Sequence, residues 1–145
     1  MVDKTTRSIV VEAPAAEVMA VIADFPQYPA WVAAVSRIEV LEPGRHGRAR
    51  KVRFVLSAGV VKDDYDLVYD WSPDGLSVSW DLVRGELQRY QHGSYTLQPQ
   101  PDGTTCVVYE LTVDLTLPMI GMIKRKAEKV ITDTALKELK KRVEG

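Results

Sequence analysis

The stretch VEAPAAEVMAVIADFPQYPAWVAAVSRIEVL, residues 11–41, carries the signals that decide the fold. The β-branched run TTRSIVVE at 5–12 predicts a strand leading into it. Pro14 then stands where a first helical turn begins. The apolar residues that follow share one helical face, at i, i+3, i+4 and i+7: Val18, Val21, Ile22 and Phe25. This part of the stretch therefore predicts a strand followed by an amphipathic helix.

Two prolines break this helix. Pro26 ends it, because the residue before a proline avoids helical angles, and Pro29 makes a second break. A short second helix is predicted over 30–35. Three aromatic residues crowd the break: Phe25, Tyr28 and Trp31. The two short helices should therefore turn a corner and not form one rod.

From residue 36 the apolar period changes to alternation, which predicts strands with one apolar and one polar face. Six such runs follow, separated by turns such as SPDG at 72–75 and QPQPDG at 98–103. Pro118 then opens a long helix that runs to about Val143. Its apolar residues are spaced by four and should cover the apolar face of the sheet: Ile123, Ala127, Ile131, Ala135 and Leu139. The order predicts one α+β domain over residues 1–145.

Composition limits the classes of partner. Lys plus Arg is 19 and Asp plus Glu is 20, so the net charge of −1 argues against binding of nucleic acid. The basic run KRKAEK at 124–129 is interspersed with acidic residues, so it indicates a solvated face and at most transient membrane contact. The single cysteine, Cys106, is compatible with a reducing compartment. The N-terminus is polar, and we expect a cytoplasmic protein.

The usual catalytic signatures are absent from the sequence. It contains no G-x-S-x-G, H-E-x-x-H, C-x-x-C or G-x-G-x-x-G motif. The two histidines, His46 and His92, lack the spaced partners that a metal site needs. We therefore expect no metal and no cofactor, and we nominate no catalytic residue.

The order of elements resembles the START and birch-pollen-allergen superfamily (SRPBCC), whose helix-grip fold wraps a sheet around a long C-terminal helix. Within it, the stretch at 11–41 and the hairpin GSYTLQPQPDGTTCVVYEL at 93–111 are similar to the bacterial polyketide cyclase/dehydrase and coenzyme Q-binding families. The resemblance covers nearly all of the chain. It implies an antiparallel sheet of about seven strands, with a cavity between sheet and helix that the two short helices close at one end.

The resemblance implies which residues line that cavity. They are the large side chains on inward strand positions, one aromatic residue at the corner and two residues of the long helix. The predicted ligand-binding set is Trp31, Phe54, Tyr65, Tyr69, Trp71, Trp80, Arg89, Gln91, Tyr95, Ile123 and Ala127.

Two of these depend on the phase of one strand. Counting back by two from Leu97 and Tyr95 places Gln91 and Arg89 inward, where Asp63 could pair with the arginine. A bulge at Gly93 would instead place Tyr90 and His92 inward. Alternation within the strand does not decide between the two phases.

Three functions are open at this point. The first is binding, with transport as an extension, of a small hydrophobic or lipid-like molecule in the cavity. The second is a polyketide cyclase or aromatase, in which Arg89 stabilises an enolate and Tyr65 or Tyr69 donates a proton. The third is a protein-binding module, which a large exposed apolar patch would favour.

Overall fold

The computed structural model describes residues 4–58, 61–115 and 121–145, and it describes their side chains except at residues 58, 61 and 121–128. The strands are β1 (Lys4–Val11), β2 (Val35–Glu42), β3 (Lys51–Ala58), β4 (Val61–Trp71), β5 (Ser77–Gly85), β6 (Gln88–Pro99) and β7 (Thr105–Leu115). The helices are α1 (Ala15–Ala23), the 3-10 turn η1 (Phe25–Gln27), α2 (Tyr28–Trp31) and α3 (Gly121–Glu144).

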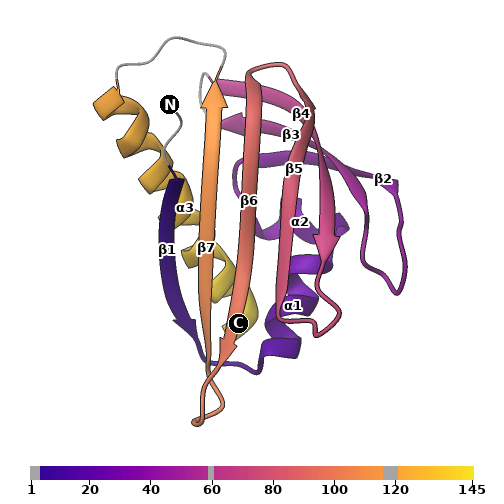
Figure 1. The fold of residues 1–145 in the computed structure, drawn as a ribbon, viewed down its shortest axis with the longest axis vertical. Helices are drawn as coiled ribbons and strands as arrows, with labels where there is room; N and C mark the ends of the chain where they lie inside the picture. The colour runs from indigo at the N-terminus through magenta and orange to yellow at the C-terminus, as the bar shows by residue number, and fades with distance from the viewer. Residues whose placement is uncertain (1–3, 59–60, 116–120) are drawn as a thin grey trace.

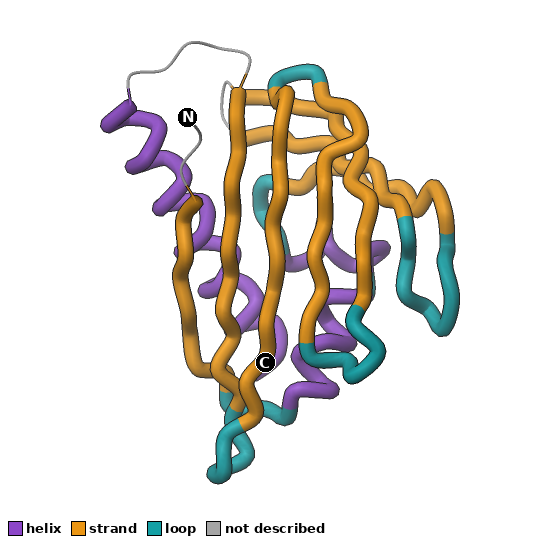
Figure 2. Tube along the Cα trace, in the orientation of Figure 1, coloured by secondary structure: helices purple, strands orange, loops and turns teal. Residues whose placement is uncertain are grey.

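The strands form one antiparallel sheet in the order β1-β7-β6-β5-β4-β3-β2. Strands β2 to β7 are a meander in which each pairs with the next, and β1 adds to the free edge of β7. All helices lie on one side of the sheet, and in Figure 1 α3 crosses behind β1, β7 and β6 while α1 and α2 lie behind the other half. Figure 2, in the same orientation, shows the helices behind the sheet and no helix on its front face. The predicted α+β helix-grip architecture of seven strands is confirmed.

The apolar core lies between the sheet and the helices. On the central strands the residues that alternate inward are buried, as the sequence predicts for a sheet covered on one face. Val18 and Ile22 bring the apolar face of α1 into this core, and Phe25 follows them in η1. On the described part of α3 the buried residues are Thr132, Leu136 and Leu139.

The second helix lies earlier in the chain than predicted. It was expected over 30–35, but α2 spans Tyr28–Trp31 and β2 already begins at Val35. Pro29 occupies the first turn of α2, where a residue needs no backbone N–H for the helix. The second proline therefore starts the helix and does not interrupt it.

The expected packing face of α3 needs a correction. Ile131 has an exposed fraction of 52%, so the prediction that it packs against the sheet is wrong. A spacing of four residues drifts by about 40° per step around a helix of 3.6 residues per turn, so a long row of such positions cannot stay on one face. Leu139, at the end of the predicted row, is buried. Ile123 and Ala127 belong to α3, but their side chains lie outside the described residues.

Three contacts fasten α3 to the first strand and the segment after it. Glu144 accepts a hydrogen bond from the backbone N–H of Glu12 at 2.8 Å, and the Lys140 ammonium donates one to the carbonyl of Val10 at 2.8 Å. Arg7 and Asp133 form an ion pair at 3.2 Å. The last helix therefore flanks the edge strand β1.

No helix in the part of the chain that the structure describes combines the length and the hydropathy needed to cross a membrane.

Candidate functional site: a cavity between the sheet and the last helix

A cavity of about 270 Å³ lies between the inner face of the sheet, α3 and the corner formed by α2. Its lining is mostly aromatic and aliphatic, with few polar side chains. The lining residues are Ile22, Tyr28, Trp31, Val32, Ala34, Val35, Phe54, Leu56, Tyr65, Leu67, Tyr69, Trp80, Gln91, Tyr95, Tyr109, Val130, Ile131, Thr134, Ala135 and Glu138. Its volume is just below the range of about 300–1,000 Å³ typical of sites for drug-sized ligands.

The sheet side of the cavity is lined by aromatic rings. Phe54 on β3 stacks on Tyr65 on β4, with ring centroids 5.3 Å apart. Trp80 on β5 lies 5.9 Å from Tyr109 on β7, and Tyr109 meets Tyr95 on β6 edge to face at 4.7 Å. These rings come from five neighbouring strands because each occupies an inward position of its strand.

The mouth of the cavity lies between α3 and the segment from α2 to β2. Val130 and Ile131 line the cavity although both are exposed, so they stand at its rim. Glu138 also lines it, and its carboxylate accepts a hydrogen bond from the backbone N–H of Ala33 at 2.9 Å. This contact ties α3 to the α2–β2 segment across the rim.

The aromatic residues of the proline-broken corner have different roles. Phe25 is fully buried and packs against Tyr69 with centroids 4.9 Å apart, so it fills the core and does not face the cavity. Tyr28 and Trp31 line the cavity, and the Tyr28 hydroxyl donates to the carbonyl of Ile22. The break in the helix therefore positions two rings at the cavity and one beneath it.

Five tyrosines surround the cavity and all remain protonated over the physiological range. Burial raises the pKa of each phenol well above its ordinary value, because water no longer stabilises the phenolate. No hydrogen bond between described residues uses the hydroxyls of Tyr65, Tyr69, Tyr95 or Tyr109. Neutral hydroxyl groups are therefore available around the cavity.

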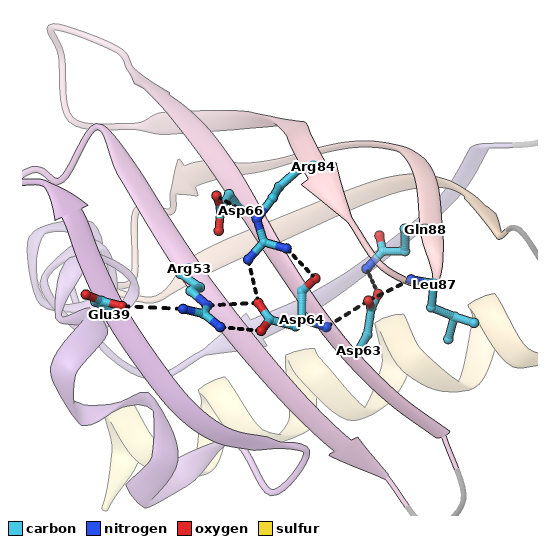
Figure 3. A network of polar contacts seen from close by, with 8 residues as sticks. All are labelled: Glu39, Arg53, Asp63, Asp64, Asp66, Arg84, Leu87 and Gln88. Atoms are coloured by element: carbon cyan, nitrogen blue, oxygen red, sulfur yellow. Dashed lines mark hydrogen bonds and ion pairs between the residues drawn. The ribbon is translucent and has the colours of Figure 1, made fainter.

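A chain of buried hydrogen bonds leads from the cavity wall into the protein. The Trp80 indole N–H donates to Gln91 Oε1 at 2.8 Å, and Gln91 Nε2 donates to Gln88 Oε1. Gln88 Nε2 then donates to Asp63 Oδ2 at 2.8 Å. Asp63 Oδ1 also accepts the backbone N–H of Leu87 at 2.9 Å (Figure 3). Of these side chains, Trp80 and Gln91 line the cavity.

Gly93 makes room for this arrangement. It pairs with Trp80 across β5 and β6, and a Cβ built on it would lie 2.4 Å from Trp80 Cζ2 and 2.7 Å from Trp80 Nε1. Any side chain here would collide with the indole ring. Gly93 is therefore needed because a ring lies close to the backbone, and not because the strand is bulged there.

The predicted inward position of Arg89 is wrong. Its side chain is 63% exposed and pairs with Asp114 at 2.8 Å on the outer face. Gln91, Gly93 and Tyr95 point inward as one unbulged run. The pairing of β6 with β7 shifts register between Gln88 and Tyr90, so Arg89 and Tyr90 both face outward. Gln88 takes the inward place instead.

The alternative phase is wrong as well. Tyr90 is exposed, and His92 contacts Asp81 at 2.8 Å on the outer face. Asp63 is buried as its phase predicts, but its partners are amide N–H groups and not an arginine.

Trp71 is partly buried against the core but does not line this cavity. Its indole N–H donates to the carbonyl of Ala49 at 2.8 Å, and the guanidinium of Arg48 lies over the ring at 5.4 Å from its centroid. It lines a separate hollow of about 510 Å³ beside the β2–β3 loop, where Arg45, His46 and Arg50 are exposed. Strand β4 extends past the end of the cavity, and Trp71 is its last residue.

The structure thus brings together seven of the predicted residues: Trp31, Phe54, Tyr65, Tyr69, Trp80, Gln91 and Tyr95. The prediction missed Tyr109, Glu138 and the buried pair Gln88–Asp63. Tyr109 could have been found, because it occupies the same strand phase as the apolar residues Val107, Leu111 and Val113. Among the described residues no group of three or more His, Cys, Asp or Glu side chains could hold a metal ion.

Comparison with solved structures supports the fold. A START superfamily protein from Mycobacterium smegmatis is 20% identical, with a TM-score of 0.89 and 97% of each chain covered. A protein from Thermus thermophilus is 22% identical, with a TM-score of 0.80 and 97% of each chain covered. The Zhui aromatase/cyclase from Streptomyces sp. R1128 is 14% identical, with a TM-score of 0.82, covering 99% of this chain and 94% of that one.

No curated protein matches the sequence. The family model described as polyketide cyclase/dehydrase and lipid transport matches residues 3–144, almost the whole chain. The predicted resemblance to the START-like superfamily is thereby confirmed. The chain belongs to the polyketide cyclase/dehydrase and lipid transport family.

Proposed function

We propose that this protein binds a small, mainly apolar molecule in the cavity between the sheet and α3. The observation that carries the proposal is the aromatic lining of a 270 Å³ cavity whose rim opens between α3 and the α2–β2 segment. Burying apolar surface contributes about 25 cal/mol per Å² removed from water, so such a wall binds a ligand of matching shape.

Binding is favoured over cyclase chemistry by the position of the charged and acidic groups. The cyclase hypothesis needs a cation at the enolate and a phenol that gives up a proton. Arg89 lies on the outer face, and burial raises the pKa of Tyr65 and Tyr69, which makes them poor acids. The cavity therefore offers shape and hydrogen bonds but no activated acid among its described residues.

The neutral fluorescent probe N-phenyl-1-naphthylamine tests this function. It should bind saturably and quench tryptophan emission, because Trp80 and Trp31 line the cavity. Trp80→Phe and Trp31→Phe should each lose part of the quenching, whereas Trp71→Phe should lose less than either, since Trp71 lies outside the cavity.

A filling variant provides an independent control. Ala135→Phe places a ring in the cavity and should abolish probe binding while the protein still melts cooperatively. Ala16→Phe adds the same ring at an exposed position of α1 and should bind the probe as the unmodified protein does. Equal binding by both variants would refute a site in this cavity.

A further inference from the structure

The cavity wall contains a hydrogen-bond chain whose direction is fixed at both ends. An indole N–H can only donate, and at the other end both carboxyl oxygens of Asp63 accept N–H groups. Trp80 therefore forces Gln91 to present its oxygen, Gln91 presents its NH₂ to Gln88, and Gln88 presents its NH₂ to Asp63. Neither amide can flip without losing a bond at one end.

This orientation leaves defined capacity for a ligand at Gln91. Its amide oxygen has two lone pairs and its NH₂ has two hydrogens, and the chain uses one of each. Gln91 lines the cavity, as do Tyr65, Tyr69, Tyr95 and Tyr109, whose hydroxyls form no hydrogen bond with a described residue. These groups can all both donate and accept, which suits a hydroxyl or carbonyl oxygen on the ligand.

Among the described residues that line the cavity, the charged groups have one sign. This lining contains no lysine, arginine or histidine, and its one carboxyl group is that of Glu138 at the rim. Behind Gln91 lies Asp63, only 4% exposed, and no ion pair between described residues involves it. An anionic ligand would lose its hydration and then meet two carboxylates without a described cation.

We infer that the cavity selects neutral apolar molecules that carry a hydroxyl or carbonyl group, and that it rejects carboxylates. This inference rests on the proposed function, since it names the ligand class of the same site. Gln91 supplies the hydrogen-bonding contact, Gln88 and Asp63 hold its amide in one orientation, and Glu138 disfavours anions at the mouth. This selectivity is opposite to that expected from an inward Arg89.

Three compounds with one ring system test the inference at neutral pH: 2-naphthol, naphthalene and 2-naphthoate, each measured by displacement of N-phenyl-1-naphthylamine. The naphthol should bind most tightly and the naphthoate most weakly, with a difference between them on the order of tenfold or more. Gln91→Met should remove the advantage of the naphthol over naphthalene.

A second pair of variants separates charge from hydrogen bonding. Glu138→Gln keeps an acceptor for Ala33 and should strengthen binding of the naphthoate several-fold, with little change for the naphthol. Glu144→Gln is the matched control, because Glu144 also lies on α3 and accepts a backbone N–H, but it does not line the cavity. It should leave all three affinities unchanged.

The outcomes distinguish the inference from the function beneath it. Failure of the fluorescent probe to bind would overturn the proposed function. Probe binding combined with equal displacement by all three compounds, with tighter binding of the naphthoate, or with displacement by none of them, would overturn the selectivity alone. If Gln91→Met does not fold, the compound series and the Glu138→Gln and Glu144→Gln pair still decide.

Discussion

Two neighbouring aspartates on β4 face opposite sides of the sheet and have different kinds of partner. Asp64 points outward and is bound by Arg53 and Arg84, in a network that continues to Glu39 and Asp66. Asp63 points inward, and its partners are the backbone N–H groups of Asp64 and Leu87 and the amide of Gln88. Figure 3 shows the two networks meeting at these adjacent residues.

The difference shows how one sheet serves water on one face and a cavity on the other. On the outer face charge compensates charge, and such pairs in partly exposed positions contribute little to stability. On the inner face the carboxylate is held by dipoles, so the chain from Asp63 to Trp80 contains no cation. The outer arginines therefore take no part in the hydrogen-bond chain beside the cavity.

The largest expected effect comes from removing Asp63. Asp63→Leu leaves three N–H groups, all at least partly buried, without this acceptor, and each costs about 1–3 kcal/mol, so we expect a loss of about 3 kcal/mol or more in the free energy of unfolding. Asp64→Leu should cost about 1 kcal/mol or less, because its arginine partners can turn to water. Urea unfolding measures both, and equal losses would contradict the contrast between the faces.

Asp63→Asn sharpens the same test. The asparagine NH₂ or its oxygen must face Gln88, and the indole at the other end can only donate. If the NH₂ faces Gln88, one link of the chain becomes donor against donor. If the oxygen faces Gln88, the NH₂ meets the N–H of Leu87. A loss of about 1–3 kcal/mol is expected, and an unchanged urea midpoint would show that the direction of the chain does not matter.

Gly93→Ala disturbs the inner face from the backbone. The new methyl group displaces the Trp80 ring, so the bond to Gln91 breaks and the packing strain costs about 1–3 kcal/mol. Tryptophan emission should shift to longer wavelength. Trp80→Phe in the same background should recover part of the stability, because a smaller ring leaves room for the methyl, and strict additivity of the two losses would contradict this account.

Acid should weaken the outer network specifically. Hydrogen bonds from Arg53 and Arg84 hold the pKa of Asp64 at about 2, below its ordinary 3.8. A carboxyl with a lowered pKa stabilises the folded state above the unfolded pKa, and this contribution is lost as pH falls through the folded pKa. The contribution of Asp64 should therefore disappear between about pH 4 and about pH 2.

Urea midpoints at several pH values in this window check that expectation. Asp64→Asn should lose stability less steeply with acid than the unmodified protein does, and Arg53→Met should also reduce the slope, since it removes the first cause of the shift. Slopes that do not differ among the three proteins would rule out this role for the network.

Arg89→Met should have the smallest effect. The residue lies on the outer face of the strand that carries Gln91 inward, and its ion pair with Asp114 is exposed. Exposed pairs contribute about 0–1 kcal/mol. Stability should change by no more than that, and binding of N-phenyl-1-naphthylamine should not change at all. A tenfold weaker affinity would show that Arg89 contributes to binding in the cavity and would contradict its outward position.

Local patterns predict most of the fold because their physical causes are local. Alternation identifies the strands, and the two prolines mark the corner, although α1 ends at Ala23 and Pro26 lies within η1. The aromatic wall follows from the same alternation, as Phe54, Tyr65 and Tyr95 illustrate.

The errors arise where the outcome depends on a partner strand or on distance. The phase of Arg89 is set by pairing of β6 with β7, where Gln88 and Tyr90 take consecutive partners, Leu115 and Asp114. The bond between Gln88 and Asp63 joins residues 25 positions apart, and no pattern within either strand reveals it. Ile131 was misplaced because helical drift moves a row spaced by four off the buried face.

The position of β1 has a consequence for how the chain folds. This strand hydrogen-bonds to β7, from the pair Lys4–Thr112 to the pair Val11–Thr105, whereas the strands of the meander each pair with the next strand in sequence. The meander can form by successive hairpins, but β1 needs closure of a loop of about a hundred residues, and such non-local contacts slow folding. Since the N-terminus is synthesised first, the first strand made must wait for the last one before it joins the sheet.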